Sequence, residues 1–88
     1  MYSEQELNHL RWECRRGMRE LDLIIQPFFD EDFLNQTEDV QRIFIELLNE
    51  SDLMLFRWLL RGEIPDNKDY VRLIDIMLEC HQKRIKTF

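Results

Sequence analysis

Hydrophobic side chains recur every three or four positions through most of the chain, which places them on one face of an α-helix. Two segments repeat the full five-position pattern: Val40, Ile43, Phe44, Leu47 and Leu48, and then Tyr70, Leu73, Ile74, Met77 and Leu78. No stretch alternates apolar and polar residues for long enough to predict a β-strand. The pattern therefore predicts an all-α protein.

Capping residues and turn formers bound the first two predicted helices. The first begins after Ser3, where Glu6 can complete a capping box, and ends near Gly17. The second covers about residues 18–32. We expect a kink or an early end at Pro27, because proline removes a backbone donor from the helix.

Three further helices follow, separated by short connections. The third is predicted to begin after Thr37. The fourth is predicted to begin after Ser51 or Asp52 and to end at Gly62. The fifth follows Pro65, with Asp66 or Asn67 as its cap. The shorter helices have their own apolar positions: Leu7, Leu10 and Cys14 in the first, Leu21, Ile24, Ile25 and Phe28 in the second, and Leu53, Phe56, Leu59 and Leu60 in the fourth. Short connections make successive helices neighbours, so we expect a compact five-helix bundle forming a single domain over residues 1–88.

Length and composition limit what the chain can be. It has 88 residues, of which 44% are hydrophobic, and no apolar run approaches the ~18 residues that span a bilayer, so membrane insertion is not expected. Export and organelle signals avoid acidic residues, whereas this chain begins with Glu4, Glu6 and Glu13. Cys14 and Cys80 are too few for a disulfide framework and are expected as reduced thiols packed like small hydrophobic side chains. We therefore expect a cytoplasmic protein.

Charge is unevenly distributed along the chain. The net charge is −6, which argues against a nucleic-acid partner, because binding to phosphates needs a basic surface. Residues 9–19 contain four arginines and one glutamate, whereas residues 20–52 contain ten acidic residues and one arginine; the tail is basic again at Lys83, Arg84 and Lys86. Such polarity suits docking on another protein, and a mixed, solvated helical surface explains it equally well.

Residues that could perform chemistry are few. His9 and Cys14 are five apart, and Cys80 and His81 are adjacent, so neither pair has the spacing of a helical metal site. The acidic segment 30–32 resembles the start of a calcium-binding loop but lacks its turn-forming glycine. There is no glycine-rich phosphate loop, and the serines are placed as helix caps. We expect neither a metal site nor a catalytic site, and the chain is not predicted to be an enzyme.

One unusual cluster surrounds Gly17. Four arginines lie near this glycine, namely Arg11, Arg15, Arg16 and Arg19, and Glu20 follows Arg16 by four positions. A helix-terminating glycine with an ion pair between Arg16 and Glu20 would explain part of the cluster. The excess of arginine equally indicates a partner-binding surface. Three nearby aromatic residues could add anchors to it, although burial in the bundle is the favoured role of each: Trp12, Phe28 and Phe29.

The segments that carry this cluster resemble the succinate dehydrogenase assembly factors, the small flavinylation factors called SdhE in bacteria, whose members have also been described as CptB-type antitoxins. The family signature Arg-Gly-x-x-Glu is present as Arg16-Gly17-Met18-Arg19-Glu20, within Cys-Arg-Arg-Gly-Met-Arg-Glu-Leu-Asp. Two further segments agree: Pro27-Phe28-Phe29 and Leu55-Phe56-Arg57-Trp58-Leu59. The resemblance covers about residues 8–65, and Met54 departs from it, since family members often have an acidic residue there.

The resemblance implies an assembly chaperone that binds the flavoprotein subunit of succinate dehydrogenase, and that of fumarate reductase. It further implies that the chaperone promotes covalent attachment of FAD to this client, while binding no cofactor stably itself. The partner-binding residues carried over are Arg16, Gly17 and Glu20, with Arg15, Met18 and Arg19 beside them. Two alternatives are an antitoxin that binds a membrane-associated toxin and a carrier of free flavin. The absence of a dinucleotide-binding motif argues against the carrier.

Overall fold

The computed structural model describes residues 2–86, which form five α-helices and two short helical turns around a shared hydrophobic core. The helices are α1 (Glu4–Glu13), α2 (Arg19–Pro27), α3 (Glu38–Leu47), α4 (Asp52–Leu59) and α5 (Lys68–Lys86). A π-helical turn, η1 (Phe28–Asp32), and a 3-10 turn, η2 (Phe33–Asn35), connect α2 to α3. The predicted all-α fold and its five helices are confirmed.

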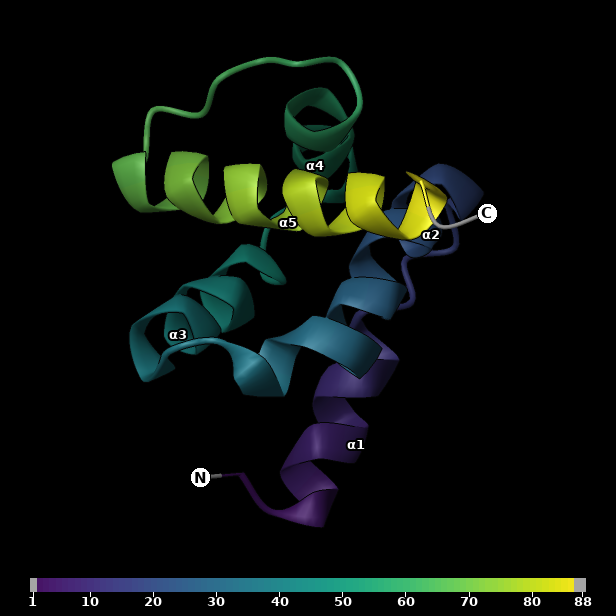
Figure 1. Cartoon of the computed structure of the whole chain (residues 1–88), viewed down its shortest axis with the longest axis vertical. Coiled ribbons are helices and arrows are strands. Elements are labelled where there is room, and N and C mark those ends of the chain that lie inside the picture. The colour runs from purple at the N-terminus through teal and green to yellow at the C-terminus, as the bar shows by residue number, and fades with distance from the viewer. Residues whose placement is uncertain (1, 87–88) are drawn as a thin grey trace.

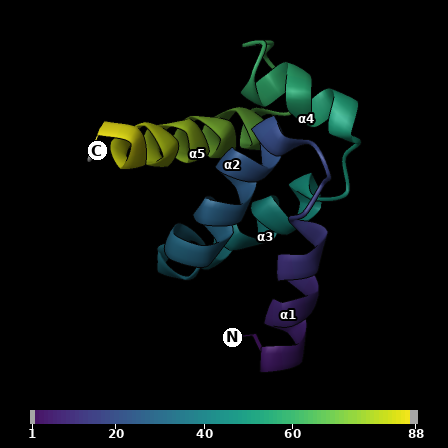
Figure 2. The same cartoon turned by 90° about the vertical axis from the view of Figure 1, so that its right-hand side faces the viewer.

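The longest helix, α5, organises the bundle. It crosses the molecule and packs against α2, α3, α4 and η1 (Figure 1). The first helix, α1, instead projects away from the other helices in both views (Figures 1 and 2). None of the helices in residues 2–86 is long and apolar enough to span a bilayer. The connection between α1 and α2 therefore lies at the junction of the projecting helix and the bundle.

Side chains cap the first turns of four α-helices, as the sequence predicts. Ser3 and Glu6 form a reciprocal capping box at α1, with bonds of 3.1 and 2.9 Å. Thr37 caps α3, Ser51 caps α4, and the Asn67 side chain accepts hydrogen bonds from two amides at the start of α5. The exception is α2, whose N-cap residue, Met18, provides no side-chain hydrogen bond.

Two predicted helix ends differ from the structure, and a third agrees with it. Helix α1 ends at Glu13, before Gly17, and α4 ends at Leu59, before Gly62, because both glycines lie in the turns that follow these helices. The early end expected at Pro27 is confirmed, because α2 ends at this residue and the chain continues as the π-helical turn η1. Proline removes one hydrogen bond of the α-helical ladder, and the path widens into the π-helical turn of η1.

Aromatic side chains fill the centre of the core. Phe44 of α3 lies between Phe28 and Phe33, with 5.3 Å between the ring centroids in each pair. All five predicted apolar residues of α3 are buried, and so are four of the five in α5, with Leu78 half-buried. The long periodic helices therefore bury the faces that the sequence predicts.

The prediction of which α4 residues are buried is wrong except for Leu59. The residues buried in this helix are Leu55, Trp58 and Leu59, whereas Leu53 is 61% exposed. Helix α4 has only eight residues, and its packing against α2 and α5 selects the buried side among several apolar positions. The ring of Trp58 lies 5.5 Å from that of Tyr70, which joins α4 to α5.

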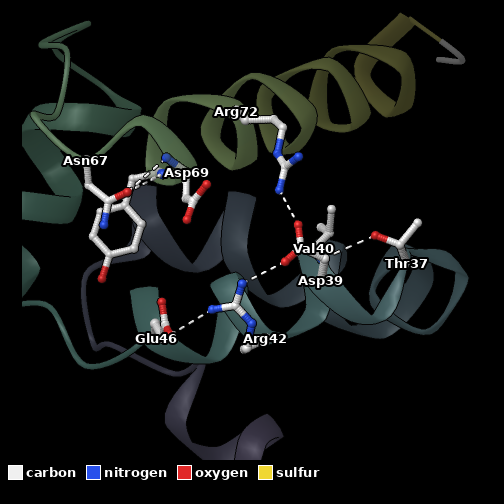
Figure 3. A network of polar contacts seen from close by, with 9 residues as sticks. Thr37, Asp39, Val40, Arg42, Glu46, Asn67, Asp69 and Arg72 are labelled. Atoms are coloured by element: carbon white, nitrogen blue, oxygen red, sulfur yellow. Dashed lines mark hydrogen bonds and ion pairs between the residues drawn. The ribbon is translucent and has the colours of Figure 1, made fainter.

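Ion pairs add further links between the elements. Arg72 of α5 donates to Asp39 of α3 at 2.5 Å, and Arg42 donates to the same carboxylate at 2.6 Å (Figure 3). These hydrogen bonds lower the pKa of Asp39, the bond from Arg72 having the larger effect. Arg84 pairs with Asp32, which joins the far end of α5 to η1. Polar links thus bridge α5 to two of the elements beneath it.

Candidate functional site

Gly17 adopts a left-handed backbone conformation in the connection between α1 and α2. Its φ is +82°, a value that glycine adopts without strain and other residues rarely do. The residue is exposed, and a Cβ added to it would meet no heavy atom within 4 Å. The backbone at Gly17 is therefore open to close approach from outside the molecule.

The Arg16 side chain points into the protein. Only 14% of it is exposed, and its Nε donates to Asp52 Oδ1 at 2.7 Å. Its two terminal nitrogens donate to three backbone carbonyls, those of Glu13 at 3.1 Å, Leu48 at 2.9 Å and Glu50 at 2.7 Å. One guanidinium thus joins the end of α1, the end of α3 and the start of α4, and the ion pair considered between Arg16 and Glu20 is not formed.

The backbone of Arg16 is also held in place. Its N–H donates to Asp22 Oδ1 at 2.9 Å, across the start of α2. The side chain and the amide of Arg16 therefore connect the segment to both neighbouring helices and to the turn between α3 and α4. Gly17 follows immediately, so its exposed backbone has a fixed position.

The remaining charged residues of the motif point outward. Arg15, Arg19 and Glu20 are exposed, and Met18 is half-buried. Within residues 2–86, none of these three charged side chains forms an ion pair or a side-chain hydrogen bond. The structure therefore gathers all six predicted residues around one connection, but it separates the inward Arg16 from the outward Arg15, Arg19 and Glu20.

An open groove runs along α2 beside Gly17. Its main part has a volume of about 520 Å³ and includes Arg19, Leu23 and Gln26 in its lining. A smaller hollow of about 190 Å³ adjoins it at Gln26 and Asp30 and is lined in part by Arg15. Because the groove is open to solvent, it suits a protein side chain better than an enclosed cofactor.

The aromatic residues near the motif differ in exposure. Phe28 and Phe29 are buried, as expected, but the expectation for Trp12 is wrong, because its residue is 72% exposed. Trp12 follows the buried Leu10 by two positions, which is more than half a turn of helix and directs its side chain away from the core. The helical spacing of α1 therefore contained the signal for an exposed tryptophan.

Both cysteines are free thiols in the structure. Cys14 is fully buried among core residues, as expected, and burial raises its thiol pKa to about 12. Cys80 is partly buried. Within the described residues, no three His, Cys, Asp or Glu side chains are grouped as a metal site would require. The thiols therefore contribute packing to the core.

Comparison with known proteins identifies clear relatives. A family described as "Flavinator of succinate dehydrogenase" matches residues 8–81. The chain is 40% identical to the FAD assembly factor SdhE of Aliivibrio fischeri over 98% of this chain and 100% of that protein. It is 42% identical to the protein of the same name from Mannheimia succiniciproducens over 88% of this chain and 90% of the relative. The corresponding Coxiella burnetii protein is 38% identical over 74% and 79%.

Proposed function

Because the chain belongs to the flavinator of succinate dehydrogenase family, we propose that it binds the flavoprotein subunit of succinate dehydrogenase and promotes covalent attachment of FAD to it. The observation that carries this proposal is the family match over residues 8–81, which includes the complete Arg16–Glu20 motif. The relatives are named FAD assembly factors, which supports this function over the antitoxin alternative.

We assign two tasks to the motif. Glu20, with Arg15, Met18 and Arg19, contacts the client, and Gly17 lets the client backbone approach closely. Arg16 acts as a positioning residue, because its guanidinium is occupied by Asp52 and by carbonyls of α1 and of the turn between α3 and α4. The motif would then consist of one internal support and an outward contact surface.

The proposed role is that of a chaperone and not of an enzyme. The bond-forming chemistry belongs to the flavin and to the client, and FAD is bound by the client. A factor that binds the attachment-competent conformation of the client would raise the yield by shifting the population toward it. We extend the proposal to a second client, the flavoprotein subunit of fumarate reductase. We also propose that the protein acts in the cytoplasm, a reducing compartment in which free thiols such as Cys14 and Cys80 persist.

The decisive experiment measures covalent flavin on the client. The succinate dehydrogenase flavoprotein subunit is expressed with and without this protein, denatured, and read by flavin fluorescence on a gel. We expect a rise with the wild-type chain and a smaller rise with Glu20→Ala. An unchanged signal, with the client soluble and FAD in excess, would contradict the proposal. In a companion titration, we expect no tight binding of FAD to the isolated chain.

A further inference from the structure

The arginines of the described chain differ in whether they have a partner. Six form ion pairs with carboxylates of the chain, namely Arg11, Arg16, Arg42, Arg57, Arg72 and Arg84. Arg61 lies over the Phe56 ring. Within residues 2–86, only Arg15 and Arg19 have neither an ion pair nor an aromatic partner, although the chain contains 18 acidic residues. Both are exposed and lie on either side of Gly17.

These two arginines border one concave surface. Arg19 lines the main groove along α2, Arg15 lines the adjoining hollow, and the two spaces meet at Gln26 and Asp30. Guanidinium groups bind carboxylates through paired, directional hydrogen bonds. Asp22, Asp30 and Glu31 also line the groove, but neither Arg15 nor Arg19 forms an ion pair with an acid of the described chain. Both guanidinium groups are therefore available to carboxylates on another protein.

The exposed Trp12 is a neighbour of Arg15. The Arg15 amide donates to the Trp12 carbonyl at 3.1 Å, so the backbones of the two residues lie one turn apart where the chain leaves α1. Tryptophan and arginine are the residue types that most often dominate the energy of protein–protein contacts, with the aromatic side chain buried in a pocket of the partner. A tryptophan residue that is 72% exposed is available for such burial.

We propose that Trp12, Arg15 and Arg19 together recognise an acidic segment of the flavoprotein client. In this arrangement carboxylates of the client pair with the two guanidiniums, and the indole enters an adjacent apolar pocket of the client. The groove carries the opposite charge at Asp30 and Glu31, so the change of sign along its length sets the direction in which the client segment lies. This inference rests on the proposed function, because it takes the client to be the flavoprotein subunit.

The charge component is tested by binding at several salt concentrations, with the full chain and the purified client subunit. The double variant Arg15→Gln/Arg19→Gln should weaken binding about tenfold or more at low salt and flatten its dependence on salt. The control is Arg57→Gln/Arg61→Gln, which removes the same charge from two exposed arginines of another surface and should bind like the wild type. Equal binding by both double variants would overturn the charge component.

The apolar component is tested by Trp12→Ala, with Ile64→Ala as the control at another highly exposed apolar residue. We expect Trp12→Ala to weaken binding about tenfold, without changing the salt dependence, and Ile64→Ala to have no effect. A second readout needs no substitution. The chain is labelled with fluorotryptophan, and the Trp12 resonance should shift on addition of the client, while that of the 8% exposed Trp58 should not.

The outcomes separate the two proposals. If the wild-type chain raises covalent flavin and binds the client, but the Trp12 resonance does not move and the variants bind normally, the recognition surface is wrong and the function stands. If the wild-type chain does not bind the client at all, the proposed function and this inference fail together. A variant that failed to fold would leave the fluorine measurement on the unsubstituted chain to decide.

Discussion

Arg16 Nε lies 2.7 Å from Asp52 Oδ1, across 36 positions of sequence, and this contact fixes the α1–α2 connection to the first turn of α4. The same guanidinium donates to the carbonyls of Leu48 and Glu50, at the end of α3 and in the turn before α4. Although Arg16 belongs to a motif at the surface, its side chain holds parts of the fold together. Loss of function on substitution at Arg16 would not identify it as a contact residue.

Arg16→Lys should destabilise the protein. Lysine retains the charge but cannot reproduce the donors of the guanidinium, so partly buried carbonyls lose partners. We expect a loss of about 2 kcal/mol in the free energy of unfolding, measured by urea denaturation. The exposed Arg15→Lys serves as the control and should leave stability unchanged. Equal stability of the two variants would contradict the supporting role of Arg16.

Gly17→Ala and Gly62→Ala form a matched pair. Both glycines have positive φ values, +82° and +74°, and neither has a heavy atom within 4 Å of an added Cβ. Each substitution should therefore cost a similar amount of stability, about 1 kcal/mol, from backbone strain alone. Only Gly17→Ala should also reduce covalent flavinylation of the client, measured beside a thermal melt.

The larger substitution Gly17→Arg should abolish flavinylation while the bundle still folds. There is open space around Gly17 for the new side chain, and that space is where the client is proposed to approach. Circular dichroism and melting should show a folded helical protein. Collapse of the helical signal in Gly17→Arg, but not in Gly62→Arg, would instead make Gly17 chiefly a structural residue.

Glu20→Ala should weaken flavinylation with little change in stability. Glu20 is exposed and has no side-chain partner among residues 2–86. Like any acidic residue in the first turn of a helix, Glu20 interacts favourably with the helix dipole, which stabilises the folded protein by about 0.3–1 kcal/mol. Glu38, in the first turn of α3, provides the control for that effect. Glu38→Ala should cost the same stability and leave flavinylation intact; a normal yield with Glu20→Ala would remove Glu20 from the surface.

Acid should weaken the link between α3 and α5. Hydrogen bonds from Arg72 and then Arg42 lower the pKa of Asp39 in the folded protein below its usual 3.8. The contribution of this carboxylate is therefore complete above that value and is lost as the pH falls through the lower, folded-state pKa. Asp39→Asn should flatten the decline in stability below about pH 4, as measured by urea unfolding. An unchanged decline would show that other carboxylates control it.

The bundle was predictable where side-chain periodicity was long and regular. Helices α3 and α5 follow directly from their five-position apolar stripes, and the caps at Ser3, Thr37 and Ser51 follow from local hydrogen bonding. The face of α4 was not predictable in this way. Its short sequence contains several apolar positions in a row, so contacts with other helices decide which of them are buried.

The candidate site was predictable as a group of residues but not in its orientation. Three partners of the Arg16 guanidinium, Leu48, Glu50 and Asp52, lie 32 to 36 positions away, and their place beside Gly17 arises only from the tertiary fold. The exposure of Trp12, in contrast, could have been predicted from the sequence. Its position relative to Leu10 already placed it on the outer side of α1, and the general tendency of aromatic residues to be buried led to the wrong expectation.

The start of α2 has a consequence for dynamics. Its N-cap residue, Met18, lacks the side-chain cap found at the other four α-helices of the described chain, so the first amides of α2 have no acceptor from a capping side chain. Amides near such an end need little free energy of local opening and exchange with solvent deuterium early. The proposed contact surface lies over this turn. Arrival of a partner should therefore be recorded as slower hydrogen exchange at Arg19 and Glu20.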